Sequence, residues 1–346
     1  MKVAIIYDNI AKEAGPDQAD TLVQVESVSQ CLEDLGHFPR RFPFSMDFSS
    51  VMNALKKWTP DLVFNLVESV EGAGRLVYLS PSILDFLGIP YTGSSTDAIY
   101  ATSNKLLTKK LLMGAGISTP EYLTMENHGH YEIVSGESYI IKSVWEHASM
   151  GIDDESIISF KEPQKLFDAM MRKMERLGGE CFAERYIEGR EFNLSMLTSE
   201  NGPMVLPPAE ILFDKYPAGK FKIVDYRAKW IRDSFEYNNT RRSFEFEEND
   251  QSLLKNLEDI AIGCWQLFGL GGYARVDFRV DKENRPWVLE INANPCISPD
   301  AGFAAAAFRA GLNFSEIISR IINDAVYFGQ HCRSISYVHK PVDSVQ

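Results

Sequence analysis

The sequence is poor in cysteine, and it has no pattern that would link the few cysteines it contains. There are five, an odd number, scattered along the chain with no C-x-x-C pair. This spacing predicts neither a disulfide framework nor a zinc site. Reduced thiols are typical of a reducing compartment, so we expect a cytoplasmic protein. The five are Cys31, Cys181, Cys264, Cys296 and Cys332.

Long apolar runs and an excess of basic residues are missing as well. No apolar run approaches the roughly 20 residues that span a bilayer. Residues 1–8 turn polar too soon for a signal peptide. The formal net charge of -13 argues against a nucleic-acid surface, because phosphate backbones are bound by clustered Lys and Arg. We therefore expect neither a membrane nor a nucleic acid as partner, although a small basic pocket for a nucleotide is compatible with this charge.

What the sequence does contain is enough apolar material for several cores. With 346 residues, 45% of them hydrophobic, it has room for two or three domains. Residues 2–7 and 61–67 are apolar runs of strand length, whereas 22–35 and 50–58 show helical spacing or composition. Strands that alternate with helices indicate an α/β sheet, in which ligands lie beyond the carboxyl ends of the strands.

Residues 273–295 are the most informative stretch. Two segments of alternating side-chain type flank a polar turn, which predicts a β-hairpin. We expect the hairpin to close with Asp281 opposite Pro286. This register places four polar side chains on one face as two facing pairs, Asp277 with Glu290 and Arg275 with Asn292.

The pair Asp277 and Glu290 consists of two carboxylates. Directly opposed strand residues have Cβ atoms roughly 4.5–5.5 Å apart, and like charges there are destabilising. A cation between them, with the carboxamide of Asn292 nearby, would remove the repulsion, and oxygen ligands suit Mg²⁺ or Mn²⁺. The alternative is a hairpin whose charges point into solvent.

Three lysines stand out by their local context. Lys105 lies in the first turn of a helix predicted for 102–112, where a cation opposes the helix dipole, so it either has an anionic partner or is solvated. Lys142 ends a strand at 138–142 and precedes a loop of small residues that can fold over phosphates, although the P-loop order is absent. Lys229, flanked by aromatic residues in a polar loop, belongs either to the surface or to an active-site lid.

Other segments are less specific. Residues 181–195 indicate a strand, a turn and a strand, bracketed by Glu184 and Glu191. Asn313, with a glutamate three residues on, begins a last amphipathic helix. Cys296 has no histidine at a recognisable spacing, so we interpret it as a packing residue and not as a nucleophile.

Together these pieces resemble the ATP-grasp ligases, and most of all the D-alanine–D-alanine ligases, over roughly residues 60–325. The resemblance rests on ordered motifs, which are GIPYTGS at 88–94, NKLLTK at 104–109, IK at 141–142, ERYIEGREF at 184–192, RVD at 275–277 and EINANP at 290–295. It implies an α/β protein of three α/β domains, with the nucleotide between the sheets of the second and third. We expect domains at 1–98, 99–184 and 185–330, followed by a tail at 331–346.

The resemblance also implies roles for individual residues. The nucleotide-binding residues would be Lys105 and Lys142 for the phosphates, Glu184 with the backbone of Tyr186 and Ile187 for adenine, and Glu191 for the ribose. The ligands of two Mg²⁺ (or Mn²⁺) ions would be Asp277, Glu290 and Asn292. Arg275 would stabilise developing negative charge, and Lys229 would reach the γ-phosphate.

The implied activity is amide-bond formation driven by ATP. ATP would convert a carboxylate into an acyl phosphate, which an amine then attacks, and the substrates would be amino acids or related small molecules. The family also allows for a homodimer. The alternatives are an ATP-grasp ligase of another pathway, forming peptides or natural products, and a non-catalytic ATP-binding protein. Arg275 argues against the last, because simple binding has little need of an oxyanion donor.

The amino-acid half of the family pattern is altered in this chain. No residue matches the family glutamate that binds the first substrate's ammonium, and Asp17 or Asp20 would have to replace it. A loop serine falls on Ala148, and the serine that binds the second substrate's carboxylate falls on Ala301. Asp300 beside it would favour an amine or a cationic group over a free carboxylate.

Overall fold

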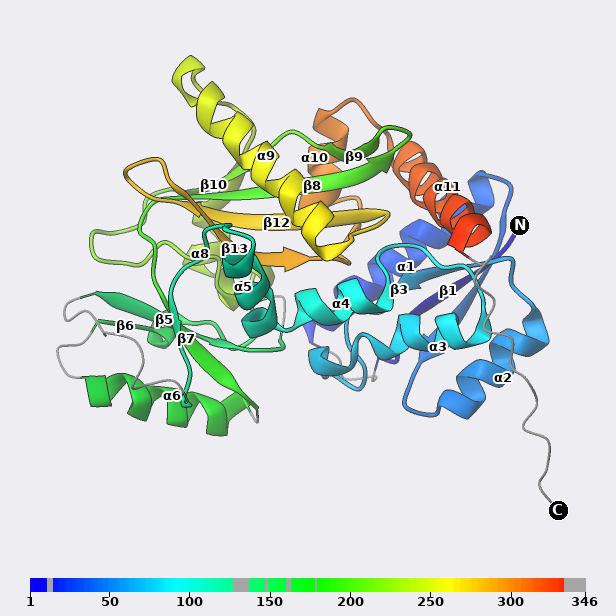
Figure 1. Ribbon diagram of the computed structural model, residues 1–346, viewed down its shortest axis with the longest axis horizontal. Helices are drawn as coiled ribbons and strands as arrows, with labels where there is room; N and C mark the ends of the chain where they lie inside the picture. The colour runs from blue at the N-terminus through cyan, green and yellow to red at the C-terminus, as the bar shows by residue number, and fades with distance from the viewer. Residues whose placement is uncertain (11–14, 127–136, 147–148, 160–162, 178, 333–346) are drawn as a thin grey trace.

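The structure is a computed structural model in which three separate β-sheets carry helices, the mixed α/β architecture that the sequence predicted (Figure 1). Each sheet draws on one continuous part of the chain, with strands between residues 2 and 66, 122 and 185, and 190 and 292. The domain boundaries themselves stay a prediction. The residues that the structure describes are 1–10, 15–126, 137–146, 149–159, 163–177 and 179–332.

The first sheet is parallel and three-stranded, in the order β2-β1-β3. Residues 3–6 of its central strand are fully buried, which explains their continuous apolar run. The two predicted strands and the two predicted helices of this region are confirmed. The elements are β1 (Lys2–Asp8), α1 (Pro16–Asp34), β2 (Phe38–Phe44), α2 (Phe48–Trp58), β3 (Leu62–Leu66) and α3 (Leu79–Leu87).

Two short helices follow α3 where the sequence predicted one helix beginning at 102. These are α4 (Thr96–Ser103) and α5 (Lys105–Gly114). The side chain of Asn104 accepts a hydrogen bond from the backbone N–H of Leu107 at 3.0 Å, and so caps α5. The predicted start was therefore wrong, because Asn104 breaks the helical run and begins a new one.

The second sheet is antiparallel and four-stranded, in the order β4-β7-β5-β6, and it lies at the lower left of Figure 1. Its strands are β4 (Tyr122–Leu123), β5 (Ser138–Ser143), β6 (Ile157–Ser159) and β7 (Cys181–Arg185). Helix α6 (Pro163–Leu177) covers one face, where its Leu166 and Met170 pack with Tyr139 and Ile141 of β5.

The third sheet is the largest, in the order β11-β10-β8-β12-β13 with β9 beside β8, and its pairs are antiparallel. Its strands are β8 (Arg190–Ser199), β9 (Gly202–Val205), β10 (Ala209–Phe213), β11 (Thr240–Ser243), β12 (Tyr273–Val280) and β13 (Pro286–Asn292). The helices of this region are α7 (Tyr226–Trp230), α8 (Phe235–Asn239), α9 (Gln251–Phe268), α10 (Gly302–Arg309) and α11 (Phe314–Cys332).

The side chains of β12 point alternately to the apolar face of the large sheet and to its polar face. Val276 and Phe278 lie in the same buried cluster as Leu257 of α9. Arg275 and Asp277, the residues on either side of Val276, line an open cleft on the other face. The alternation that predicted this strand therefore also decides which residues reach the cleft.

The predicted hairpin register is confirmed for the residues that line the cleft, but it is wrong near the turn. The two facing pairs are those expected, Asp277 opposite Glu290 and Arg275 opposite Asn292. Nearer the turn, however, Val280 and not Asp281 lies opposite Pro286. The register shifts after Asp277 because β13 carries one extra residue, Leu289, in a β-bulge.

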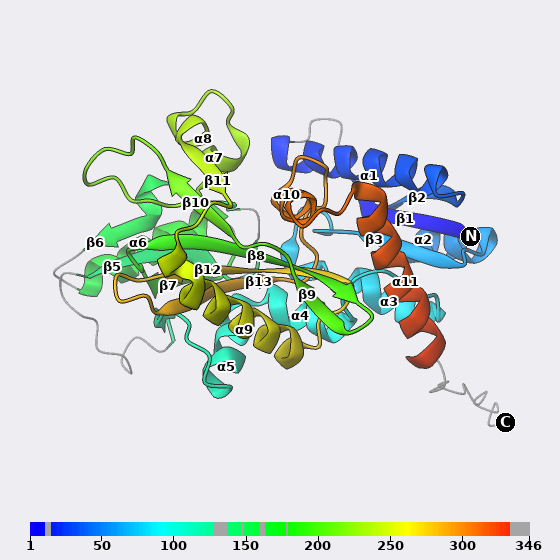
Figure 2. The same ribbon diagram turned by 90° about the horizontal axis from the view of Figure 1, so that it is seen from above.

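The last helix closes the fold against the first sheet. As predicted, it begins with a reciprocal cap: the Glu316 N–H donates to Asn313 at 3.0 Å, and the Asn313 N–H donates to Glu316 at 2.7 Å. Ile317 and Ile321 of α11 share a buried cluster with Phe64 of β3, so α11 packs on the first sheet as well as on β8. Figure 2 shows α11 beside α1.

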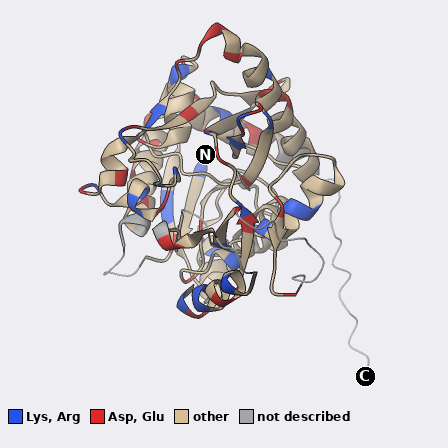
Figure 3. Cartoon of the chain, turned by 90° about the vertical axis from the view of Figure 1, so that its left-hand side faces the viewer, with Lys and Arg blue, Asp and Glu red and all other residues tan. Residues whose placement is uncertain are grey.

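Charge is distributed in a mixed way over the surface. Figure 3 shows Asp and Glu residues interspersed with Lys and Arg residues over one side of the molecule. Each helix in the described part of the chain is too short or too polar to cross a bilayer.

Candidate active site

One cleft of about 660 Å³ collects every residue that the sequence singled out for nucleotide, metal or catalysis. The second sheet, the large sheet, the end of β1, helix α1 and the loop after β3 all contribute to its walls. The predicted residues that line it are Lys105, Lys142, Glu184, Tyr186, Ile187, Glu191, Lys229, Arg275, Asp277, Glu290 and Asn292.

The guanidinium of Arg275 lies beside the facing carboxylates. It donates from Nε to Oδ1 of Asp277 at 2.7 Å and from Nη2 to Oδ2 at 2.8 Å, and Nη2 is 4.0 Å from Oε1 of Glu290. Arg275 thus supplies part of the positive charge that we expected from a divalent ion. The alternative of a hairpin whose charges simply face solvent is excluded, because Asp277 is buried.

The surroundings of Asp277 disfavour its ionised form. Burial raises the pKa of Asp277 even though Arg275 opposes the shift, and the charge of Glu290 raises it further. A cation beside Asp277 would therefore stabilise its ionised form.

The donor set itself fits a hard cation. Asn193 donates from Nδ2 to Oδ1 of Asp277 at 2.7 Å, and Oδ1 of Asn292 accepts the N–H of Asn294 at 3.0 Å but keeps a second lone pair. Mg²⁺ is usually held by one or two carboxylates, with water and phosphate oxygens completing the shell. Within the described residues no group of three or more His, Cys, Asp or Glu could hold a metal ion.

Lys105 is buried, which excludes the solvated alternative, since only 6% of its surface is exposed. Its Nζ donates to the carbonyl oxygen of Glu146 at 2.5 Å. Burial lowers the pKa of Lys105, whereas the negative charge of Glu290 acts in the opposite direction. The ammonium of Lys105 therefore lies within reach of the charge of Glu290 on β13.

Glu184 holds two lysines together in the wall of the cleft. Its carboxylate accepts from Lys142, and its Oε2 is 2.8 Å from Nζ of Lys109. Burial alone would raise the pKa of Glu184, but these two ammonium groups lower it overall. Lys109 is also buried and donates to Thr119 at 2.8 Å. It was not singled out beforehand, although it lies one helical turn after Lys105.

The residues predicted for adenine and ribose form a neighbouring part of the wall. Tyr186 stacks edge-on against Phe221, with ring centroids 5.2 Å apart, and Ile187 is buried. Glu191 forms an ion pair of 2.8 Å with Arg279, whose guanidinium lies 5.5 Å from the ring centroid of Tyr186. Apolar rings next to a fixed carboxylate provide a surface suited to a base and its sugar.

Lys229 reaches the cleft from a short helix, where the sequence predicted only a polar loop. Asp225 caps this helix by accepting from the N–H of Ala228 at 2.8 Å. Burial first and then Arg275 lower the pKa of Lys229, whereas Glu290 raises it. These couplings place the ammonium among the groups of the hairpin, so a purely surface position is excluded.

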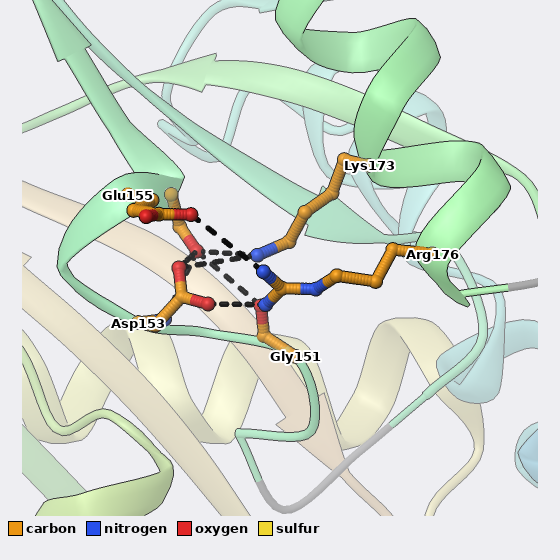
Figure 4. Close-up of polar contacts among 6 residues, drawn as sticks. Gly151, Asp153, Glu155, Lys173 and Arg176 are labelled. Carbon is orange, nitrogen blue, oxygen red and sulfur yellow. Dashed lines mark hydrogen bonds and ion pairs between the residues drawn. The ribbon is translucent and has the colours of Figure 1, made fainter.

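The loop after β5 is anchored by a polar cluster on α6 (Figure 4). Nζ of Lys173 donates to Ser156 at 2.8 Å and to Asp153 at 3.3 Å, and Arg176 also binds Asp153. Ser156 in turn donates to the carbonyl oxygen of Gly151 at 3.3 Å. The cluster fixes the segment that leads into the cleft.

The same segment holds the loop that carries Lys229. The hydroxyl of Ser149 donates to the carbonyl oxygen of Val224 at 2.7 Å. The N–H of Tyr226 donates to the carbonyl oxygen of Ile152 at 3.3 Å. Two segments far apart in sequence therefore cover the cleft together.

The end of the cleft near the first sheet is acidic. Both oxygens of Asp8 accept backbone N–H groups, from Glu68 at 2.8 Å and Ser69 at 2.9 Å. Glu68 itself accepts from Gln24 at 3.2 Å, and burial, followed by the charge of Asp8, raises its pKa to about 8. Sequence reasoning missed Glu68, although its place directly after the strand predicted at 61–67 was a usable signal.

The candidates for substrate recognition have different outcomes. Asp20 and Asp300 both line the cleft. Cys296 donates its S–H to Asp20 at 3.1 Å, and burial raises the pKa of the thiol, which supports a packing role. The side chain of Asp17, like all of Ala148, lies outside the residues that the structure describes.

Comparison with known proteins gives a consistent result. Residues 111–323 match the model of a family described as D-ala D-ala ligase C-terminus. A D-alanine–D-alanine ligase of Aquifex aeolicus is 28% identical over 299 residues, covering 86% of this chain and 92% of its own length. A D-alanine–D-alanine ligase from Synechococcus sp. (strain JA-3-3Ab) is 29% identical over 342 residues. This match covers 96% of this chain and 98% of the relative.

Solved structures share the whole fold. The crystal structure of D-alanine–D-alanine ligase from Bacillus anthracis complexed with ATP superposes with a TM-score of 0.70 at 19% identity, covering 96% of this chain and 99% of that one. D-alanyl-alanine synthetase A from Vibrio cholerae gives a TM-score of 0.71 at 16% identity. This match covers 94% of this chain and 98% of that one. The architecture is thus that of the ATP-grasp fold, as the sequence predicted. Within it, the chain belongs to the D-alanine–D-alanine ligase family.

Proposed function

We propose that this protein is an ATP-dependent carboxylate–amine ligase that joins amino acids or closely related small molecules. The observation that carries the proposal is the hairpin register, which holds Arg275, Asp277 and Glu290 on one face of the cleft. Lys105 and Lys142 line the same cleft. Carboxylates for a cation, ammonium groups for phosphates and a guanidinium for an oxyanion are the groups that such a reaction requires.

The chemistry explains why these residue types are needed. A carboxylate is a poor electrophile, so transfer of the γ-phosphoryl group would first convert it into an acyl phosphate. An amine would then attack the acyl carbon, and phosphate would leave as the amide forms. Lys105, Lys142 and Lys229 would bind and orient the phosphates, while a bound Mg²⁺ would offset their charge.

Arg275 would act on the tetrahedral oxyanion of the second step. It gives Asp277 one N–H of Nε and one of Nη2, so further N–H groups of the guanidinium remain for the reacting oxygen. Losing one such donor typically costs about 2.7–4 kcal/mol of barrier.

We extend the proposal to the nucleotide and its ions. Two Mg²⁺ or Mn²⁺ ions would bind to Asp277, Glu290 and Asn292. The adenine would lie against Glu184, Tyr186 and Ile187, and the ribose against Glu191. In support, all of these residues line the one cleft. The contacts of Glu184 with Lys109 and Lys142 further suggest that this carboxylate also positions the phosphate-binding ammonium of Lys142.

We also propose a cytoplasmic location and a homodimer. The described cysteines Cys31, Cys181, Cys264 and Cys296 are free thiols, which supports a reducing compartment. Sedimentation analysis of the purified protein would measure the oligomeric state.

The activity is tested by ADP and phosphate release with ATP and Mg²⁺ over pairs of amino acids of both configurations, D-alanine included. We expect ADP formation that requires both an acid and an amine, with the amide detected by mass spectrometry. A protein that binds ATP by calorimetry, yet turns over with no pair, would favour a non-catalytic ATP-binding protein.

Variants of the carboxylate pair test the metal assignment. We expect Asp277→Asn and Glu290→Gln each to lower turnover by about 100-fold or more. Each should also weaken Mn²⁺ binding measured by paramagnetic resonance in the presence of a non-hydrolysable ATP analogue. Asp259→Asn, an exposed acid on α9, is the matched control. Normal activity and normal Mn²⁺ affinity in either cleft variant would remove the assignment.

A further inference from the structure

Arg242 lies at a part of the cleft that the nucleotide-binding residues leave unexplained. It stands on β11 opposite Ile211 of β10, and both residues line the cleft. Its guanidinium lies against Gly302, the first residue of α10, since a Cβ placed on that glycine would be 3.3 Å from Nε and from Nη2. A side chain at position 302 would therefore crowd the guanidinium, and glycine leaves its position open.

The guanidinium of Arg242 has no ion-pair partner among the residues that the structure describes. The adjacent Arg241 binds Asp214 at 2.5 Å, and Arg309 of α10 binds Glu245 at 2.8 Å. The guanidinium of Arg242 makes no hydrogen bond and no ion pair with any residue in the described ranges. Such a guanidinium at the wall of a cleft is available to an anion from outside the protein.

The surroundings of Arg242 indicate which anion that is. Burial and the positive charge of Arg275 lower the pKa of Arg242, and Asp300 acts in the opposite direction. Arg242 is therefore close to the guanidinium proposed for the reacting oxygen. Lys105 and Lys142, in contrast, contact Glu146 and Glu184 in another wall, so the phosphates have their own cations.

We propose that Arg242 binds the free carboxylate of the amine-donating substrate and so selects an amino acid as acceptor, an inference that rests on the proposed ligase function. The planar fork of a guanidinium matches a carboxylate through two parallel hydrogen bonds. In an α-amino acid the carboxylate is attached to the same carbon as the attacking nitrogen. An acceptor whose nitrogen attacks beside Arg275 therefore brings its carboxylate toward Arg242.

The acids at this end of the cleft complete the match to an amino acid. The charge of Asp300 helps to raise the pKa of Asp20, and the same charge acts on Arg242. Carboxylates and an unpaired guanidinium side by side complement a molecule with both an ammonium and a carboxylate. A simple amine or a diamine, which Asp300 alone would favour, would leave Arg242 without a partner.

The test compares acceptors that differ only in the carboxylate. Wild type, Arg242→Gln, Arg242→Lys and the surface control Arg309→Gln are assayed for ADP formation with an amino-acid acceptor and with its primary amide. We expect Arg242→Gln to raise KM for the amino acid by about 10- to 100-fold, the usual range for a lost hydrogen bond to a charged group. KM for ATP, and KM for the amide, should stay unchanged.

Further outcomes separate this inference from the ligase proposal. Arg242→Lys should restore part of the preference for a carboxylate, because it keeps the charge without the fork, and Arg309→Gln should behave like wild type. An equal loss with both acceptors, an unchanged preference, or a change confined to KM for ATP would overturn the role of Arg242.

If wild type forms no ADP with any pair, the ligase proposal fails instead. Calorimetric titration of the amino acid and its amide, with a non-hydrolysable ATP analogue bound, then decides the inference. Tighter binding of the amino acid in wild type, lost in Arg242→Gln, supports it, and equal binding in the two proteins overturns it.

Discussion

Replacement of Glu68 by glutamine should change how the stability of the protein depends on pH. Burial first, then repulsion by Asp8, raises the pKa of Glu68 from its ordinary value of 4.5 to about 8. Between these values the folded protein holds a proton that the unfolded chain has released. The free energy of unfolding therefore falls as pH rises through this window, and the loss is complete above the folded-state pKa.

The size of the effect follows from the same shift. A single proton of difference gives a limiting slope of about 1.4 kcal/mol per pH unit. Water screens the charge of the half-buried Glu68, which narrows the pH window but leaves the slope per proton unchanged. Because the folded and unfolded chains each titrate partly near the ends of the window, we expect an average slope of roughly 1 kcal/mol per pH unit. Glutamine can keep the hydrogen bond to Gln24 but has no proton to release. The variant should thus gain about 2 kcal/mol relative to wild type between about pH 5.5 and 7.5.

The assay is urea unfolding followed by tryptophan fluorescence at a series of pH values without nucleotide. The control is Glu33→Gln, which removes an exposed acid from α1. Its difference from wild type should stay nearly constant with pH. If the difference between Glu68→Gln and wild type were equally constant, Glu68 would titrate alike in the folded and unfolded chains, and the reasoning from burial would be refuted.

Two further substitutions probe the walls of the cleft. Lys109→Met should lower the free energy of unfolding by about 3–5 kcal/mol, because the buried carboxylate of Glu184 would keep only one of its two ammonium partners. The exposed Lys110→Met is its control, and equal unfolding midpoints for the two variants would contradict the argument. Gly151→Ala should cost about 1–3 kcal/mol and raise KM for ATP, because φ is +71° at Gly151 and an added Cβ would collide with the side chain of Leu177. Gly179→Ala, in open space, is the control for the denaturation and kinetic measurements.

The central hairpin shows what a sequence can predict about a site. Its alternation and its polar turn were enough to place Asp277 opposite Glu290, because both signals are local to about 20 residues. The bulge at Leu289 was not predictable, because an apolar residue beside an acid has no local signature. Its effect is to put Leu289 and Glu290 both on the cleft side of β13.

Contacts between distant segments account for the rest of what was missed. Glu184 was expected to face a ligand, and the structure shows it between two lysines that lie 75 and 42 positions away in the chain. Arg242 lies on a short edge strand that follows a polar segment, so no periodic pattern pointed to it. Such pairings depend on how the sheets pack together, which spacing along the chain does not encode.

The hydrogen bonds of Ser149 and Tyr226 have a consequence for how the cleft exchanges its contents with water. The segment of Ser149 and the segment of Tyr226 cannot move apart without breaking these hydrogen bonds. Admission of a ligand and withdrawal of the Lys229 ammonium should therefore occur as a single event. The contacts of Asp153 with Lys173 and Arg176 would keep the first of the two segments attached to α6 during that event.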